Sequence, residues 1–361
     1  MRKDISNQTT HYLTTTIISL VFFCLLPACN RKKPVKPIPA FYHWQTRFQT
    51  GPLASALMTD LVVRKLYIKC FDVDWDFQKK EPVALATLEP MTNLSGKVEF
   101  IPAIFITNRT LINISEQDIP DLALKISRKL DQQLQAFSRQ TIREIQFDCD
   151  WTRLTRAKYF HFLETMKSYY NIKGISLSAT IRLHQIKYPD DTGVPPVKRG
   201  MLMYYNMGKV EELNTINSIL DNQVGKKYLS KLRQYNLPLD VALPLYQWGV
   251  LFRNGKMIKL INQLSKKDLE DPSRFVKKGH YWEVRKSTYL KGYYLYKSDL
   301  IRLERSELPQ LILAADLLSR QLKKENRSIA FYHLDESVLG NFREKDLQEI
   351  IDAFATENEI D

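Results

Sequence analysis

Two pairs of aspartates in this chain are spaced two residues apart, and each pair is followed directly by a tryptophan. They are Asp72 and Asp74 before Trp75, and Asp148 and Asp150 before Trp151. Each pair ends a short apolar run typical of a buried strand, and residues two apart on a strand face the same way. Two carboxylates facing one pocket can act as general acid and base, which is the chemistry that cleaves a glycosidic bond.

The elements that must position these residues alternate between strand and helix. Eight runs rich in β-branched and aromatic residues predict strands at 40–44, 65–73, 99–106, 144–149, 174–181, 200–205, 240–246 and 328–333. Helical patterns occur at 52–65, 116–137, 152–170, 211–235, 308–323 and 343–354. This alternation predicts an α/β fold, a parallel (β/α)8 TIM-type barrel over residues 40–361. The alternative, an open doubly wound sheet, requires a Gly-rich phosphate loop that the sequence lacks.

A long interval predicts a small antiparallel insert between the seventh strand and the helix after it, over residues 249–307. Short strand patterns occur there at 280–284, 289–296 and 300–303, with turns at Gly279 and Gly292. The crossover after the fifth strand is short and rich in proline, so we expect no full helix in it.

In such a barrel, ligands bind at the C-terminal ends of the strands. The candidates for catalysis at these predicted ends are Asp148, Asp150, Tyr205, Asp335 and Glu336. The candidates for substrate binding are His43, Trp44, Asp72, Asp74, Trp75, Trp151, Arg182, Asn206, Tyr246, Trp248 and His333. An indole ring stacks on the C–H face of a pyranose while carboxylates bond its hydroxyls, so we expect a carbohydrate ligand. A single tryptophan at a rim more often packs under loops, but four at one end favour a ligand.

Alternation along the strands predicts which side chains face the barrel interior. The residues predicted to face inward are Cys70, Asp72, Asp74, Gln146, Asp148 and Asp150, with Ser176, Ser178, Thr180 and Arg182 together on one face of the fifth strand. Ile145, Phe147 and Cys149 should face the helices. Cys70 and Cys149 are therefore expected to be buried free thiols on opposite faces.

Three segments resemble the chitinase-like barrels of glycoside hydrolase family 18 and, more closely, a bacterial family of lipoprotein barrels distantly related to them. Residues 148–151 (DCDW) resemble the end of the D-x-x-D-x-D-x-E strand, 203–206 (MYYN) the sixth-strand M-x-Y-D/N, and 242–246 (ALPLY) the seventh-strand G-x-P-x-Y. The resemblance covers most of 40–335 and implies a barrel that binds sugar through Asp150, Tyr205 and Asn206.

The chain departs from the family pattern at two positions of the catalytic motif. The resemblance implies a general-acid glutamate at the position of Thr152 and an aspartate at that of Ile145. Threonine does not ionise near neutral pH and cannot act as that acid. Three alternatives therefore stay open: a glycosidase whose acid lies elsewhere among the rim carboxylates, a barrel that binds glycan without cleaving it, and a structural or assembly lipoprotein.

Metal and proton-transfer chemistry are weaker hypotheses. His333, Asp335 and Glu336, with Asp72 and Asp74, could ligate a hard cation, but no spacing is diagnostic, so we expect no metal and no other cofactor. His43 and His333 end neighbouring strands and are either a proton-transfer pair or hydrogen-bonded rim residues.

The N-terminus predicts export. Residues 17–26 (IISLVFFCLL) form an apolar run of the length found in signal peptides, and 26–29 (LPAC) resembles the lipobox of bacterial lipoproteins. That resemblance implies a signal peptide over 1–28 and lipidation of Cys29, followed by a basic, proline-rich tether over 29–39. The alternatives are an uncleaved anchor or a wrongly assigned start of the sequence. We expect the lipid to anchor the chain in a bacterial membrane, on the periplasmic face of the outer membrane.

Composition limits the remaining classes. The chain has 361 residues, is 44% hydrophobic and carries a formal charge of +13, which indicates a basic globular protein. A positive net charge is typical of proteins that bind nucleic acid. An exported chain meets no genome, so we expect no nucleic acid and assign the charge to the membrane surface, acidic glycan or solubility.

Overall fold

The computed structural model describes residues 36–89, 98–135 and 141–355, which belong to one compact unit. The predicted signal peptide, Cys29 and the tether up to residue 35 lie outside the described residues. No helix in the described part of the chain has both the length and the apolar character needed to cross a membrane.

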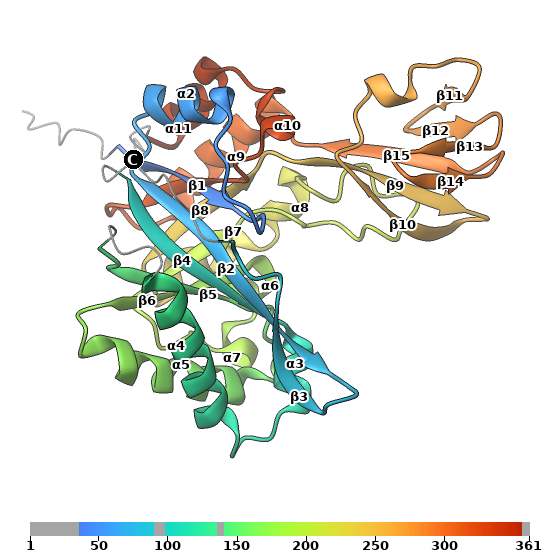
Figure 1. Cartoon of the computed structure of the whole chain (residues 1–361). Helices are drawn as coiled ribbons and strands as arrows, with labels where there is room; N and C mark the ends of the chain where they lie inside the picture. The colour runs from blue at the N-terminus through green and yellow to red at the C-terminus, as the bar shows by residue number, and fades with distance from the viewer. Residues whose placement is uncertain (1–35, 90–97, 136–140, 356–361) are drawn as a thin grey trace, which may run out of the picture. The chain divides into compact units, whose positions relative to one another are not determined.

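Eight parallel strands close into a barrel, as predicted (Figure 1). They are β1 (Ile38–His43), β2 (Lys65–Asp76), β4 (Glu99–Ile106), β5 (Glu144–Asp148), β6 (Ser176–Arg182), β7 (Arg199–Met203), β8 (Leu239–Pro244) and β16 (Ser328–Tyr332). Each pairs in parallel with the next, and β1 pairs with both β2 and β16, which closes the sheet. The strands are buried on both faces, which explains their nearly continuous apolar sequences.

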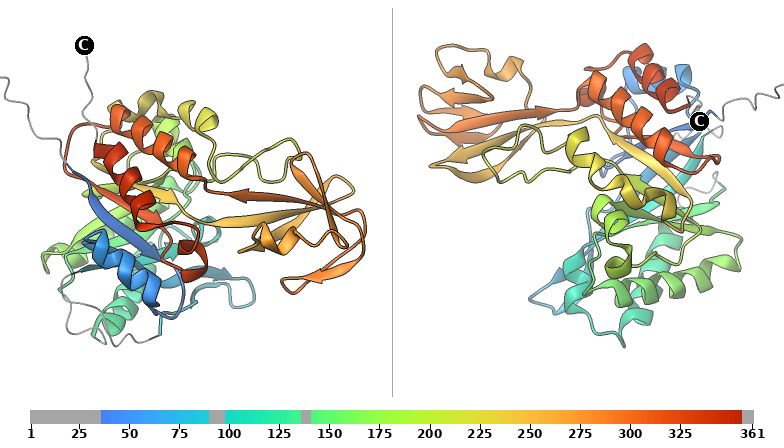
Figure 2. Two further views of the ribbon diagram at one scale, coloured as in Figure 1. Left: turned by 90° about the horizontal axis from the view of Figure 1, so that it is seen from above. Right: turned by 180° about the vertical axis from the view of Figure 1, so that it is seen from behind.

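Helices follow most of the strands and cover the outside of the barrel, where α9 and α11 pack side by side (Figure 2). The helices are α2 (Pro52–Asp60), α3 (Asn108–Asn113), α4 (Ile119–Gln135), α5 (Arg156–Asn171), α6 (Leu183–Lys187), α7 (Pro189–Thr192), α8 (Asn222–Lys226), α9 (Leu308–Gln321), α10 (Glu336–Leu339) and α11 (Glu344–Ala355), with 3-10 turns η1 (Leu229–Gln234) and η2 (Lys267–Leu269). Leu122, Ile126 and Leu130 form the buried stripe of α4. The crossover after β6 contains only the short α6 and α7, as expected.

The antiparallel insert lies between β8 and α9, as predicted. Its five-stranded sheet has the order β10 (Lys256–Asn262), β9 (Gln247–Arg253), β15 (Leu300–Arg305), β12 (Tyr281–Val284) and β11 (Phe275–Lys278). The strands β9 and β15 lead from the barrel into this sheet (Figure 1). The segment 289–296 turns at Gly292, as predicted, and forms a hairpin, β13 (Thr288–Leu290) and β14 (Tyr293–Leu295), in which Lys291 and Gly292 have positive φ. A further strand, β3 (Glu81–Leu85), pairs antiparallel with the end of β2.

The inward and outward faces of β5 and β6 agree with the predicted alternation. Ile145, Phe147 and Cys149 pack in the apolar layer under the helices. Inside the barrel, the Tyr42 hydroxyl donates to Gln146 at 2.5 Å, and Thr180 Oγ1 donates to Asp148 at 2.5 Å.

The prediction that Cys70 faces inward is wrong. The register between β2 and β4 shifts between Lys69 and Phe71, so one extra residue is accommodated there. Cys70 and Phe71 consequently both pack in the outer apolar layer, while Lys69 turns inward and binds Asp72. Cys70 and Cys149 are both buried free thiols, as expected, but they lie in the same outer layer.

Candidate functional site

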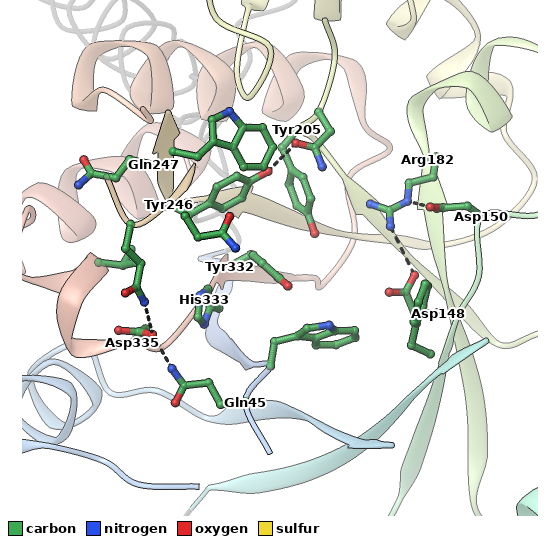
Figure 3. Close-up of a pocket in the computed structure, with 17 residues that line it drawn as sticks. Gln45, Asp148, Asp150, Arg182, Tyr205, Tyr246, Gln247, Tyr332, His333 and Asp335 are labelled. Atoms are coloured by element: carbon green, nitrogen blue, oxygen red, sulfur yellow. Dashed lines mark hydrogen bonds and ion pairs between the residues drawn. The ribbon is translucent and has the colours of Figure 1, made fainter. Parts of the chain in front are cut away.

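A cavity of about 490 Å³ opens at the C-terminal ends of the barrel strands, between the barrel and the first strands of the insert. Its lining residues are Trp44, Gln45, Phe105, Asp148, Asp150, Arg182, Tyr205, Asn206, Tyr246, Gln247, Trp248, Asn262, Gln263, Tyr332, His333, Asp335 and Val338. Figure 3 shows Arg182 with two aspartates on one side, Asp335 with Gln45 on the other, and tyrosine rings between them.

Arg182, the last residue of β6, binds both aspartates of the Asp-Cys-Asp segment. Its Nε donates to Asp150, and its Nη2 lies 3.7 Å from Asp148 Oδ1 (Figure 3). The alternation of β5 turns Asp148 inward, and Asp150 follows just after the strand. The arrangement places one cation between two carboxylates, so both aspartates have the same cationic partner.

Asp148 is a cavity carboxylate whose environment favours the protonated form. Burial raises its pKa, and the charges of Asp150 and Asp72 add to that effect. Arg182 and the Thr180 hydroxyl oppose it, because both stabilise the ionised form. Burial also raises the pKa of the Tyr205 phenol, so Tyr205 is a neutral hydrogen-bonding group near neutral pH.

Aromatic rings form one continuous wall of the cavity. The ring centroids of Tyr246 and Trp248 are 5.2 Å apart, and those of Trp44 and Tyr332 are 5.8 Å apart. Tyr332 also lies 5.6 Å from Tyr205, so these contacts link all five rings through Tyr332 and Tyr246. The contacts hold each ring in place without a ligand.

Side-chain amides supply most of the remaining polar groups. They are Gln45, Asn206, Gln247, Asn262 and Gln263. Asn206 accepts a hydrogen bond from the Tyr246 hydroxyl at 2.6 Å. Asp335 accepts from Gln45 at 2.5 Å and from Gln263 at 3.4 Å, so it joins the loop after β1 to the insert. Its other oxygen accepts from the Ser337 backbone N–H at 2.8 Å and so caps the N-terminus of α10. Both oxygens of Asp335 therefore have partners within the protein.

The histidines divide between the cavity and the core. His333 lines the cavity, whereas His43 is fully buried and packs against Phe48 with ring centroids 4.8 Å apart. Burial, with a smaller contribution from His333, lowers the pKa of His43 to about 4, and burial also lowers that of His333. Both imidazoles are therefore neutral near pH 7, and His43 cannot contact a ligand in the cavity.

The predicted site residues that line the cavity are Trp44, Asp148, Asp150, Arg182, Tyr205, Asn206, Tyr246, Trp248, His333 and Asp335. The predicted residues outside its lining are His43, Asp72, Asp74, Trp75, Trp151 and Glu336. Trp151 is fully buried, stacks on Tyr159 at 5.0 Å and donates from Nε1 to the Thr192 carbonyl. Strand β5 ends at Asp148, so alternation no longer places the residue three positions later.

The remaining carboxylates outside the cavity have structural partners. Glu336 accepts from the Ala54 backbone N–H at 2.9 Å, near the start of α2. Asp74 binds Arg109 and Thr107, and Arg109 holds the pKa of Asp74 below its usual range. Asp72 binds Lys69 at 3.1 Å. Trp75 packs against the outer core.

Sequence reasoning missed Gln45, Phe105, Gln247, Asn262, Gln263, Tyr332 and Val338. Alternation could have found Tyr332, which is two residues after the inward-facing Ala330. No local signal identifies Asn262 and Gln263, because they reach the cavity only through the way the insert folds against the barrel.

Thr152 lies at a second cavity, of about 420 Å³, that shares Asp150, Arg182, Tyr205 and Asn206 with the first. Thr152 is exposed. Within the described ranges, no group of three or more His, Cys, Asp or Glu side chains could hold a metal ion. The two cavities therefore adjoin each other at these four shared residues.

No protein-family model and no curated protein matches this chain. Solved structures do match. The spore cortex-lytic enzyme SleL of Bacillus megaterium is 13% identical, with a TM-score of 0.53, over 89% of this chain and 75% of that one. The class V chitinase of Nicotiana tobaccum is 13% identical, with a TM-score of 0.52, over 89% and 99%. The Group IV chitinase of Ostrinia furnacalis, in complex with allosamidin, is 11% identical, with a TM-score of 0.53, over 89% and 99%.

These similarities agree with the predicted resemblance to chitinase-like barrels. They extend over both the barrel and the insert, since 89% of the chain is covered. The chain thus has the fold of the chitinase-like barrels, at a low sequence identity.

Proposed function

We propose that the protein binds an oligosaccharide in the cavity at the barrel mouth. One observation carries the proposal: five side-chain amides and five Trp and Tyr rings line a single cavity. Amides donate and accept hydrogen bonds, as sugar hydroxyls require, and aromatic faces pack against the C–H faces of sugar rings. The rings are already held by one another, so binding orders few side chains.

The neighbours of known structure support a sugar as the ligand. A variant of the Nicotiana tobaccum class V chitinase, with a TM-score of 0.52 to this chain, was solved in complex with NAG4. The cavity here lies at the C-terminal ends of the strands, where barrels of this kind bind their ligands. A chain of β-linked amino sugars is therefore the first ligand to test.

The same cavity favours binding over chitinase-type cleavage. Thr152 cannot supply a proton, Arg182 is shared between Asp148 and Asp150, and Asp335 caps α10. Arg182 in this position fixes the carboxylates as acceptors for sugar hydroxyls. The protein then acts as a glycan-binding barrel.

Slow glycoside hydrolysis is the second candidate function, favoured by the raised pKa of Asp148. A buried carboxyl that keeps its proton at a higher pH can protonate a leaving group. Asp150, which is half exposed, would be the second carboxylate.

We also propose that the chain is an exported lipoprotein, anchored through Cys29. The support is the apolar run followed by Leu-Pro-Ala-Cys and a basic tether. Replacing Cys29 by Ser should abolish incorporation of radiolabelled palmitate and release the protein from membranes. Palmitate labelling that survives in Cys29→Ser would refute this assignment.

Isothermal titration of residues 35–361, the compact unit, with chitin oligosaccharides and peptidoglycan fragments tests the binding proposal. Trp44→Ala and Tyr246→Ala should each weaken binding at least tenfold. Tyr188→Ala, at an exposed tyrosine outside the cavity lining, should change nothing. Equal affinity in all four proteins would exclude the cavity as the binding site.

Reducing-end release from the same glycans separates the two candidate functions. Release that Asp148→Asn and Asp150→Asn both abolish would establish a glycosidase. Binding without release would establish a glycan-binding barrel. Release that neither variant changes would show that the catalytic residues lie elsewhere.

A further inference from the structure

The insert contains a segment whose composition differs from that of the cavity. Residues 285–297 (RKSTYLKGYYLYK) hold four basic residues, four tyrosines and no acidic residue. The insert as a whole, 249–307, has 14 Lys and Arg against 7 Asp and Glu, which accounts for about half of the formal +13. Binding in the cavity explains none of this positive charge.

The hairpin β13–β14 has an apolar face toward the core of the insert and a tyrosine-rich face toward solvent. Leu290 and Leu295 are buried in the apolar core of the insert. Tyr289 and Tyr294 face each other across the strands, with ring centroids 4.9 Å apart. Tyr296 lies 5.0 Å from Tyr294. The three rings are 69%, 43% and 52% exposed, so they form a continuous row of phenols on the solvent side.

Two lysines without ion-pair partners in the described part of the chain lie at the open end of the hairpin, near this row of tyrosines. The Ser287 hydroxyl accepts from the Lys297 backbone N–H at 3.0 Å, which brings Lys286 and Lys297 to the same end of the hairpin. Neither lysine makes an ion pair with any described residue. Lys291, at the turn, lies 3.4 Å from Asp268, and Arg253 under Tyr296 is paired with Asp299, so those two charges are already matched.

We propose that this tyrosine patch, defined as Tyr289, Tyr294 and Tyr296 with Lys286 and Lys297, binds an anionic polysaccharide, at a site separate from the cavity. The lysines pair with carboxylates or other acidic groups of the polymer, and the phenols exchange hydrogen bonds with its hydroxyls. This site rests on the proposed function and extends it. A polymer bound in the cavity is held close to the tyrosine patch, so the effective concentration there is high and the overall affinity increases.

Two other anionic partners fit the tyrosine patch less well. Lysines attract anionic headgroups, but stable binding to a bilayer also needs apolar side chains that enter the acyl region, and here the leucines of the hairpin point into the core. Single-stranded nucleic acid stacks its bases on parallel aromatic platforms. The rings of the tyrosine patch meet edge to face, at 67° and 87°, and provide no such platform.

Affinity gel electrophoresis of residues 35–361 tests the proposal, with polygalacturonate as the anionic polymer and dextran as the neutral one. We expect retardation by polygalacturonate alone, weakened by added salt. Lys286→Gln/Lys297→Gln and Tyr289→Ala/Tyr294→Ala should each lower the affinity at least fivefold. The matched controls Lys323→Gln/Lys324→Gln and Tyr188→Ala, at exposed residues away from the insert, should leave it unchanged.

Three outcomes would overturn the proposal. The first is a control lysine pair that lowers the affinity as much as the patch pair does, which would show that only net charge matters. The second is a set of patch variants, checked by circular dichroism to be folded, that bind polygalacturonate as the parent does. The third is tighter binding of phosphatidylglycerol vesicles or DNA than of polygalacturonate to the patch. Titration of chitin oligosaccharides into the patch variants separates this site from the cavity, because cavity binding should be intact.

Discussion

Glu304 of β15 accepts a hydrogen bond from the indole N–H of Trp248, at 2.9 Å, and so holds a ring of the cavity wall from inside the insert. The same carboxylate accepts from the Ser218 backbone N–H at 3.0 Å and binds Arg302 at 2.6 Å. Arg302 in turn donates to the carbonyls of Val210 and Glu212. One buried ion pair therefore fastens the loop after β7 and a cavity ring to the insert.

We predict that Glu304→Ala destabilises the protein by about 3–5 kcal/mol, because it leaves the fully buried Arg302 without its anion. Urea unfolding measures this loss. Glu304→Gln, which keeps an acceptor for Trp248, should preserve the emission maximum of Trp248 better than Glu304→Ala does. Glu307→Ala breaks an exposed pair with Arg305 and should cost little. Equal losses in Glu304→Ala and Glu307→Ala would contradict the role of this buried pair.

A second prediction concerns Arg182. Arg182→Met removes the cation that opposes the raised pKa of Asp148, so the pKa of Asp148 should rise further. An acid whose folded pKa lies above its unfolded pKa destabilises the fold as pH rises through that range. The variant should therefore lose more stability at pH 7 than at pH 5, measured by urea unfolding. Adding Asp148→Asn should recover much of that loss; a loss that is the same at both pH values would argue against this coupling.

Asp240, inside the other end of the barrel, gives a third prediction. Burial raises its pKa from 3.8 to about 6, although Arg199 and the Ser328 N–H oppose this effect. The folded form resists ionisation, so the contribution of Asp240 to stability is complete below about pH 4 and is lost as pH rises to about 6. The loss amounts to about 3 kcal/mol.

Asp240→Asn keeps an acceptor for Ser328 and does not ionise. The difference in unfolding free energy between parent and variant should therefore shift in favour of the variant between pH 4 and pH 7. Asp346 provides a control of opposite sign, because hydrogen bonds from Arg343 lower its pKa to about 2. The stability due to Asp346 should be lost only as pH falls towards 2.

Much of the barrel could be predicted because its strands are buried on both sides. The bounds predicted for the run at 99–106 agree with the strand Glu99–Ile106, since apolar residues fill it from Phe100 to Ile106. The strands β9 and β10 were missed, although Asn254-Gly255 between them has the composition of a tight hairpin turn. Both residues have positive φ, at 50° and 76°. The turn residues at 254–255 therefore indicate a hairpin, whereas the strands predicted within 249–307 begin only at residue 280.

The site was harder to predict than the fold, for a physical reason. Alternation predicts the direction of a side chain only while the strand continues and stays in register. Asp148 satisfies both conditions and faces inward, Cys70 lies at a register shift, and Trp151 lies beyond its strand. Residues such as Gln263 depend on packing between the insert and the barrel, and no local pattern encodes that packing.

The revised positions of two tryptophans lead to the last prediction. Trp44 lines the cavity, and its ring lies 5.8 Å from that of Tyr332. Trp151 is fully buried and bonded to the Thr192 carbonyl at 2.8 Å. Trp151→Ala should cost about 3–5 kcal/mol in unfolding free energy, because it opens a cavity and orphans a carbonyl. Below its melting point this variant should keep the oligosaccharide affinity of the parent.

Trp44→Ala should weaken oligosaccharide binding at least tenfold while changing the melting temperature little, which is the opposite of what we expect for Trp151→Ala. Thermal melting and calorimetric titration of the two variants side by side make the comparison. If Trp151→Ala lost affinity while remaining folded, and Trp44→Ala did not, the ligand would bind on the helix side of β5 and the cavity would be the wrong site. The contrast depends on position alone, since both changes delete the same side chain.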